Sequence, residues 1–436
     1  MAARKASGKC LFRAVNAPKT TRNAPERQAL AARNGGVVDL RPVFDDPPEK
    51  PRAWWLRVNW PMVLCAAALL AVGVLFIRSA CAVRVGRAHE LWRQMLWPWI
   101  PLGVAAHLVV AAIDYRRWTE WAWAFYLFAL VLLALVLVPG IGTSHMGARR
   151  WLFGRFQPSE GAKFALVTTL AFVLGGGMAL GERTKLWLAL GLAAVPAALV
   201  LMEPDLGTTI PFVAAAFAMV FVAGCAKRTL LALVLAGALG ASVFLGAILL
   251  PERLPPERRA RVEAVTGRFL HRHWKDRVLV FVHPERDLQG AGWNAWQSKI
   301  AVGSGGERGK GYMKGTQNAL GYLPVSVSSS DFIFSVIAEE TGFAGSAAVL
   351  GLFALLLASV AWTGLRCRDE AGRLVCTGVG AILFTHVFVN IAMTIGVMPI
   401  TGIPLPLVSY GGTFAISTLA LLGLVQSVSI HGRAEA

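Results

Sequence analysis

Residues 297–342 read QSKIAVGSGGERGKGYMKGTQNALGYLPVSVSSSDFIFSVIAEETG, a glycine-rich polar segment that runs into a long apolar helix. The segment places one carboxylate, Asp331, at the start of that helix. An ionisable group at the edge of a membrane segment costs free energy and therefore suggests a function, whereas a carboxylate that caps a helix N-terminus is a purely structural alternative. The sequence leaves both interpretations of Asp331 open.

The composition around this segment indicates a membrane protein. Of the 436 residues, 56% are hydrophobic and only 16% are charged. Apolar runs of about 18 residues or more recur along the chain, and each can cross a hydrocarbon core of roughly 30 Å. These runs are rich in Leu, Ala and Val and are about twice as long as a β-barrel strand requires. We therefore predict an all-α, polytopic membrane protein.

We predict about ten transmembrane helices. The first four cover about 60–77, 95–113, 118–138 and 160–180. The next three end near 202, 224 and 250, and the last three cover about 332–362, 374–395 and 415–430. The predicted organisation is a disordered basic cytoplasmic tail (1–58), helices 1–7 (59–250), a large extracytoplasmic loop with amphipathic segments (251–330) and helices 8–10 with a short C-terminus (331–436). Both termini are predicted to be cytoplasmic, which places the large loop and Asp331 outside.

The net charge of +18 does not indicate nucleic-acid binding. The basic residues lie between apolar runs, where they orient the helices and contact anionic headgroups. The six cysteines do not form a disulfide framework either, because the predicted topology leaves only Cys81 in the oxidising outer compartment. No nucleotide-binding loop, hydrolase elbow or zinc spacing is present, since GSGGERGKG at 303–311 lacks the GK[ST] ending and follows no predicted strand.

Charged residues gather at three other predicted span ends. The outer loop after the third span carries Arg149, Arg150 and Trp151, and the fourth span opens with Glu160 and Lys163. Glu160 has the position of ordinary helix-start chemistry, and Lys163 either faces a polar cavity or extends its ammonium to the interface. Glu203 and Asp205 interrupt the apolar sequence between the fifth and sixth spans. Either one of these acids caps the sixth helix, or both bind a cation or a substrate.

One outer carboxylate, several cations and a membrane cavity suit transfer of a group from a lipid-linked phosphate. A pyrophosphate leaving group needs cations more than it needs a proton, so a single base that activates the acceptor hydroxyl is sufficient. A transporter could line its pathway with the same charges, and a scaffold protein would need none of them for chemistry. On physical grounds alone, all three classes remain open.

Several motifs resemble one known family. They are QSKIAVGSGGERGKG (297–311), GTQ (315–317), DFIFSVIAEETG (331–342), MTIGVMPITGIPLPLVSYGG (393–412), GARRW (147–151), QPSEGAK (157–163) and EPDLGTT (203–209). In this order they resemble the SEDS proteins of shape, elongation, division and sporulation, and the elongation (RodA-like) members more than the division (FtsW-like) members. The resemblance covers the chain from the first span to the tenth.

The resemblance implies a ten-span peptidoglycan glycosyltransferase of the bacterial cytoplasmic membrane. Such an enzyme polymerises lipid II outside the membrane and works with a class B penicillin-binding protein. It also implies that Asp331 is the catalytic base. It implies substrate contacts for Lys163, Arg150 and Trp151. We also predict substrate contacts for Arg149, Gln297, Lys299, Lys310 and Gln317, and a polar network for Glu160, Glu203, Asp205, Glu339 and Glu340, of which the last two alternatively serve helix packing.

The sequence departs from the family pattern at three places. Ser329 and Ser330 replace a His-Thr pair, with about two extra residues between Pro324 and Asp331, Glu203 replaces a glutamine, and the 147–160 loop is about two residues short. A lipid II flippase and a non-catalytic activator of a penicillin-binding protein are the alternative functions. The need for a divalent cation, Mg²⁺ or Mn²⁺, stays open.

Overall fold

The computed structural model describes residues 56–82, 90–145, 148–154, 156–203, 205–225, 227–251, 254–255, 272–283, 287 and 290–432. Most of the predicted cytoplasmic tail (1–58) therefore lies outside the described residues, as do residues 256–271 of the predicted outer loop. The four-part organisation of the chain stays a prediction.

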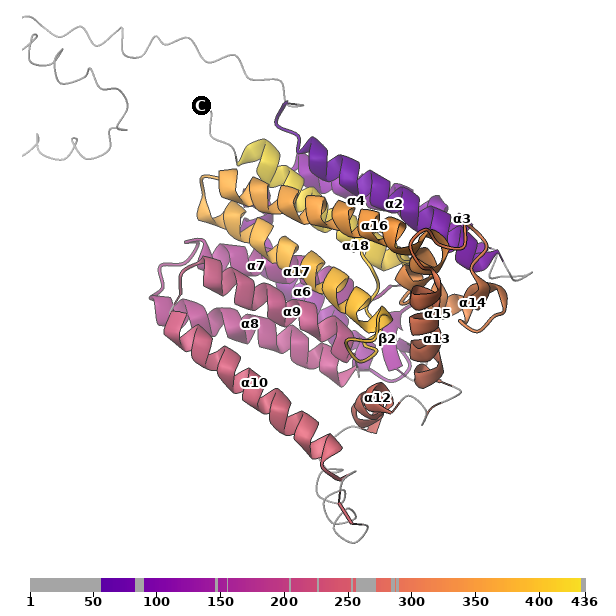
Figure 1. Cartoon of the computed structure of the whole chain (residues 1–436). Coiled ribbons are helices and arrows are strands. Elements are labelled where there is room, and N and C mark those ends of the chain that lie inside the picture. The colour runs from indigo at the N-terminus through magenta and orange to yellow at the C-terminus, as the bar shows by residue number, and fades with distance from the viewer. Residues whose placement is uncertain are drawn as a thin grey trace, which may run out of the picture. The chain divides into compact units, whose positions relative to one another are not determined.

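The described chain is a bundle of long helices, and one of them matches each predicted span (Figure 1). They are α2 (Trp60–Cys81), α4 (Ile100–Ala112), α6 (Ala122–Leu137), α7 (Pro158–Leu174), α8 (Glu182–Met202), α9 (Leu206–Val222), α10 (Lys227–Leu249), α16 (Ile333–Arg366), α17 (Glu370–Thr394) and α18 (Gly412–His431). Short segments α3 (Leu91–Gln94) and η4 (Met95–Trp99) lead into α4, and α5 (Tyr115–Glu120) precedes α6. The predicted all-α membrane fold is confirmed.

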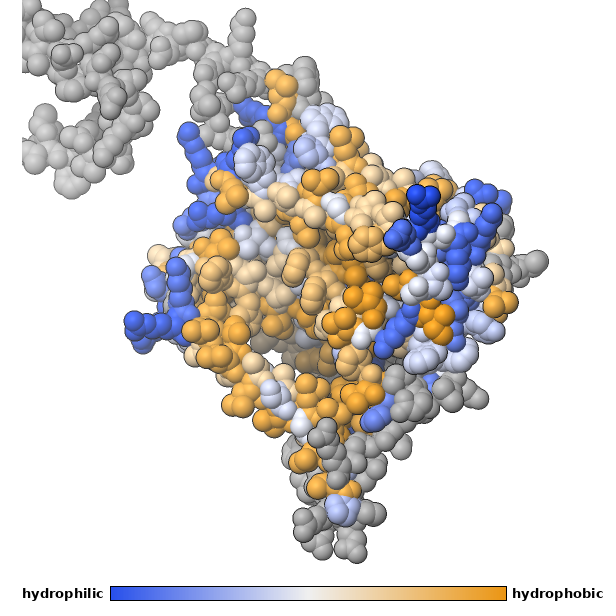
Figure 2. Space-filling model, in the orientation of Figure 1, coloured by the Kyte–Doolittle hydropathy of each residue, from blue (hydrophilic) through white to orange (hydrophobic). Residues whose placement is uncertain are grey.

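Length and hydropathy agree with a membrane location. Seven of the described helical segments are long and apolar enough to cross a membrane, and α6 and α9 are shorter apolar helices. The remaining one, α7, carries Glu160 and Lys163 in its first two turns. Figure 2 shows apolar side chains over the middle of the bundle and hydrophilic side chains gathered toward its ends, which is the distribution that a bilayer favours.

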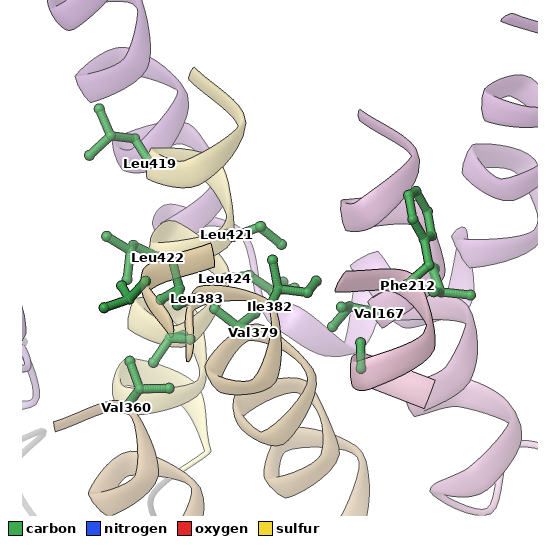
Figure 3. Packing of buried hydrophobic residues seen from close by; sticks show 14 of the residues in the cluster. Val167, Phe212, Val360, Val379, Ile382, Leu383, Leu419, Leu421, Leu422 and Leu424 are labelled. Atoms are coloured by element: carbon green, nitrogen blue, oxygen red, sulfur yellow. The ribbon is translucent and has the colours of Figure 1, made fainter. Parts of the chain in front are cut away.

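α17 lies at the centre of the bundle, because it packs against α7, α9, α16 and α18. Figure 3 shows Val379, Ile382 and Leu383 of α17 among apolar side chains of the neighbouring helices. Those neighbours include Val167, Phe212, Val360, Leu421, Leu422 and Leu424. Gly378 of α17 permits this close packing, since a Cβ there would lie 2.7 Å from Met219 Sδ of α9. Small residues that let helices approach are the usual means of helix association in lipid.

Short elements gather at one end of the bundle, which we call the outer end after the predicted topology (Figure 1). They are α12 (Arg272–Val282), α13 (Ala291–Ser304), α14 (Thr316–Ala319), α15 (Val325–Ser328) and an antiparallel hairpin of β1 (Gly142–His145) and β2 (Ala148–Leu152). In the hairpin, Thr143 lies opposite Trp151. α13 docks on the bundle through Ser298, whose hydroxyl contacts Ser335 Oγ of α16 at 2.5 Å and donates to the Thr394 carbonyl of α17 at 2.8 Å.

Candidate active site

Asp331 lies in the turn between α15 and α16, and its side chain is half-buried. It does not cap α16, because the helix begins at Ile333 and its N-cap is Phe332, which makes no side-chain capping bond. The structural alternative for Asp331, a helix N-cap, is therefore wrong. The carboxylate at the start of this membrane helix has no capping function that would explain its position.

Three consecutive carbonyls fix the backbone at Asp331. The Tyr410 amide donates to Ser329 O at 2.8 Å, Ser409 Oγ donates to Ser330 O at 2.5 Å, and Asn390 Nδ2 donates to Asp331 O at 2.8 Å. The first two donors belong to the irregular segment before α18, and Asn390 belongs to α17. Two distant parts of the chain thus hold the turn that presents the carboxylate.

The irregular segment 399–411 is itself held by side chains. Arg277 Nη1 of α12 donates to the carbonyls of Ile400 and Thr401, Asn390 Nδ2 donates to Ile403 O at 2.7 Å, and His386 Nδ1 lies 3.3 Å from Pro404 O. Backbone carbonyls outside helices and strands need such partners when they are buried. His386 and Asn390 both position the backbone around Asp331.

The electrostatic surroundings of Asp331 favour a proton acceptor. Burial raises the pKa of Asp331 from 3.8 to about 6, while Ser330 and the positive charges of Arg277 and Arg150 lower it, and Asp205 raises it. A pKa close to neutral lets the group be ionised at physiological pH and still accept a proton in a transition state.

A second group of charges stands on the hairpin and at the start of α9. Arg150 Nη1 lies 3.3 Å from Asp205 Oδ2, and Asp205 caps α9 by accepting from the Thr208 amide at 3.1 Å. The predicted cap on the sixth transmembrane helix is confirmed. Arg149 is exposed on β2, and the Trp151 carbonyl accepts from Thr143 Oγ1 at 3.1 Å. Arg150 and Asp205 both act on the carboxylate of Asp331, so this group belongs to the same site.

Glu203 lies beside that group and is 1% exposed. Among the described residues, neither of its carboxylate oxygens has a hydrogen-bond partner. Burial, with a smaller contribution from Asp205, raises the pKa of Glu203 from 4.5 to about 8, although Arg150 lowers it. Glu203 is therefore a neutral acid at physiological pH, and it can stand in for the glutamine that the family motif has at this position.

Lys163 is buried inside the bundle. Its side chain is 1% exposed, and Nζ lies 2.8 Å from Glu160 Oε1 and 3.0 Å from His386 Nε2. Ser417 Oγ donates to the other oxygen of Glu160 at 2.8 Å. Because the ammonium can only donate to Nε2, His386 carries its proton on Nδ1 and donates it to Pro404 O. The predicted polar cavity around Lys163 is thus a closed network, and it touches the Asp331 site through His386.

Glu339 and Glu340 hold the glycine-rich loop to α16. Glu339 Oε1 accepts from Lys310 Nζ at 2.6 Å and from the amides of Thr316 and Gln317 at 2.8 and 3.1 Å. Glu340 accepts from the Ser79 hydroxyl and, at 3.1 Å, from the Met313 amide. The predicted polar network at these two carboxylates is present, and Lys310 and Gln317 take part in it.

The same loop repairs a break in α16. Gly342 has φ of 67° and interrupts the helix, which frees backbone groups on both sides. The amides of Lys310 and Gly311 donate to the carbonyls of Glu339 and Glu340, and the amides of Phe343 and Ala344 donate to Gly306 O and Glu307 O. A broken membrane helix is stable only when its free backbone groups find such partners. This requirement explains the glycine pattern that superficially resembles a phosphate-binding loop.

The remaining predicted residues lie on α13. Gln297 is buried, and Lys299 is half-buried against Gly396 at the end of α17. Lys299 and Arg277 line one small cavity together with Met393, Met398 and Ile400. Arg277 was not predicted, because nothing in residues 272–282 distinguishes it from Arg272 or Lys275; only the hydrogen bonds of the folded chain do.

The described residues do not fit a protein-held metal ion. No three of their His, Cys, Asp and Glu side chains form a group that could bind one.

Comparisons with known proteins show which family has this architecture. Residues 59–434 match the family model of the FtsW, RodA and SpoVE proteins, described as cell cycle protein. The chain belongs to the SEDS family. It is 36% identical over 391 residues to the peptidoglycan glycosyltransferase MrdB of Escherichia coli K12, which covers 88% of this chain and 97% of MrdB.

Solved structures of SEDS proteins have the same fold. The rod shape determining protein RodA of Thermus thermophilus is 29% identical, with a TM-score of 0.60 over 87% of this chain and 99% of that chain. A chain from a peptidoglycan synthase complex that coordinates polymerization and crosslinking is 31% identical, with a TM-score of 0.69 over 87% of this chain and 100% of that chain. This SEDS protein is therefore RodA-like, as its motifs predict.

Proposed function

We propose that this multi-pass membrane protein is a peptidoglycan glycosyltransferase that polymerises lipid II into β-1,4 glycan strands during cell elongation. The observation that carries the proposal is Asp331, a half-buried carboxylate with a pKa of about 6 and a backbone held at three consecutive carbonyls. It lies at a membrane interface among arginines, as a reaction on a lipid-linked pyrophosphate requires.

An apolar groove beside this site suits the lipid chain of the substrate. The groove is open, has a volume of about 410 Å³ and is lined by Leu201, Leu206, Thr209, Ile210, Val213, Ala214 and Phe217. It begins at Leu206, the residue after Asp205, and runs along α9. A polyprenyl tail in this groove would place its pyrophosphate next to Arg150 and the hairpin.

The proposed reaction is an inverting displacement. Asp331 accepts the proton of the 4-hydroxyl on the acceptor's N-acetylglucosamine, and that oxygen forms a bond to C1 of the donor's N-acetylmuramic acid. The bond from C1 to the phosphate oxygen breaks, and its electron pair leaves with undecaprenyl pyrophosphate. Attack opposite the α-linked phosphate gives the β-1,4 bond.

We assign the stabilisation of the leaving pyrophosphate mainly to Arg150 and Arg149 of the hairpin. Arg150 has a side chain that is 20% exposed, and Arg149 is exposed, so both can reach a ligand. Lys163 is fully buried and already paired with Glu160. It would stabilise the pyrophosphate through its electric field from within the closed network, or by direct contact after that network opens. No step depends on a protein-held metal ion.

We further propose that the active site faces the outside of the cytoplasmic membrane, that both termini are cytoplasmic, and that a class B penicillin-binding protein is the partner. The likeness to a chain of a peptidoglycan synthase complex supports the partner. The predicted positive-inside arrangement supports the orientation.

The test is polymerisation of purified lipid II by the full-length protein with its candidate partner and Mg²⁺. Asp331→Asn should lose on the order of 100-fold or more of the activity while it stays folded, because general bases contribute about that much. Glu307→Gln, the same kind of exchange on an exposed outer carboxylate, should retain activity. Equal polymer from wild type and Asp331→Asn would remove Asp331 from the mechanism. If neither makes polymer, transport of lipid II across vesicles would distinguish the flippase from the activator.

A further inference from the structure

Arg277 belongs to α12, a short helix of the large outer loop that packs against α10 and α13. Its Nη1 donates to the carbonyls of Ile400 and Thr401, at 3.2 and 2.9 Å. One guanidinium nitrogen thus holds two consecutive peptide groups of a segment that has no regular secondary structure. α12 is thereby attached to the segment that surrounds Asp331.

These two peptide groups lie directly beside the carboxylate. Gly402 follows Thr401, and a Cβ at Gly402 would lie 3.5 Å from Asp331 Oδ2. On another side, a Cβ at Gly207 of α9 would lie 2.5 Å from Thr401 O. The backbone from Ile400 to Gly402 therefore lies in close contact with α9, with Arg277 and with Asp331, and a shift of this segment would move the surroundings of the carboxylate.

The charge of Arg277 also acts on Asp331. Burial lowers the pKa of Arg277, and so does Arg150, while Asp205 and Asp331 raise it. In return, Arg277 lowers the pKa of Asp331 against the effect of burial. The charged groups that face Asp331 are thus Arg277 from α12, Asp205 from the start of α9 and Arg150 from β2.

We propose that Arg277 is a positioning residue for Asp331: it fixes the Ile400–Gly402 backbone against the carboxylate and supplies a positive charge to it from the outer loop. This inference rests on the proposed role of Asp331 as the base. It makes the docking of α12 a condition for full activity.

The experiment measures lipid II polymerisation from pH 5.5 to 8.5 by the full-length protein with its partner. Arg277→Gln retains an N–H donor but removes the charge. The acid limb of the profile, the pH below which kcat/KM declines, should therefore move up by about half a pH unit to one pH unit. Activity at pH 6 should then fall about 2- to 5-fold more than activity at pH 8. Arg277→Lys retains the charge but not the guanidinium geometry, so its limb should stay near that of wild type while kcat decreases.

Asp276→Asn is the matched control, since this exposed neighbour on α12 also changes the charge by one. Its acid limb should coincide with that of wild type. If Arg277→Gln also keeps the wild-type limb while Asp331→Asn is inactive, the inference about Arg277 is overturned and the proposed function stands. An active Asp331→Asn would instead refute the proposed function. A thermal unfolding curve for each variant separates these outcomes from misfolding, and Arg277→Lys remains informative if Arg277→Gln does not fold.

Discussion

Replacing Glu203 with glutamine should stabilise the protein at neutral and alkaline pH. Glu203 follows the last residue of α8, is 1% exposed and has no hydrogen-bond partner among the described residues. Burial raises its pKa from 4.5 to about 8. At pH 7 the folded protein thus holds a neutral acid, whereas the unfolded chain carries a solvated carboxylate.

The size of the effect follows from the two pKa values. Between pH 4.5 and 8 the unfolded chain has released a proton that the folded protein still binds, so the free energy of unfolding decreases as the pH rises. Each unit costs about 1.4 kcal/mol, which amounts to about 3 kcal/mol at pH 7 and between about 4 and 5 kcal/mol near pH 8. Glutamine has nearly the same shape and does not titrate, so it removes this pH-dependent loss.

The assay is thermal unfolding of wild type and Glu203→Gln in one detergent at pH 5, 6, 7 and 8. The two unfolding temperatures should differ least at pH 5 and diverge as the pH rises, with the variant more stable. Glu182→Gln is the matched control, since it makes the same exchange on an exposed side chain at the other end of α8. A difference that does not change with pH, or a wild type that is more stable at pH 8, would refute a neutral Glu203.

Two further predictions concern the buried network and the glycine-rich loop. Lys163→Met should destabilise the protein by about 3–5 kcal/mol, because it leaves the charge of Glu160 buried and unpaired. Adding Glu160→Gln to the same chain should restore much of that loss. Chemical denaturation of the single and double variants checks this, and additive losses of stability would contradict it. Gly309→Ala should cost clearly more stability than Gly306→Ala, because a Cβ at Gly309 overlaps the Glu340 carbonyl. Gly306 has open space around it, and its positive φ costs alanine about 1–2 kcal/mol. Equal unfolding temperatures for the two alanine variants would disprove the close contact between loop and α16.

Much of the fold could be predicted because hydropathy alone determines where a chain crosses a membrane. Each predicted span has its helix, and the ends agree within a few residues except where a short helix or a glycine break intervenes. The break at Gly342 was not predicted, since its helix is apolar on both sides and its repair comes from backbone groups of residues 306–311. Hydrogen bonds between backbone groups leave no mark on the side-chain pattern.

The candidate site was predictable only in part, for a related reason. Asp331, Arg150 and Asp205 are charged residues at span ends, where their free-energy cost reveals them. Arg277 is one basic residue among several in an amphipathic segment, and its role depends on the carbonyls that it meets in the folded chain. Lys163 shows the opposite limitation: its position in a span indicated a polar cavity, but the fold closes that cavity with Glu160 and His386.

The departure at Ser329 and Ser330 has a physical explanation in the same geometry. The bonds that hold the Asp331 turn in place use the carbonyls of residues 329, 330 and 331, which every amino acid provides. The two serine hydroxyls donate to nearby backbone carbonyls, those of Val325 and Ser326. Because Tyr410, Ser409 and Asn390 hold the turn through its backbone, the side chains before Asp331 can change without releasing the carboxylate. A different pair of side chains at these positions should therefore alter the pKa of Asp331, which Ser330 lowers, more than it alters the position of the carboxylate.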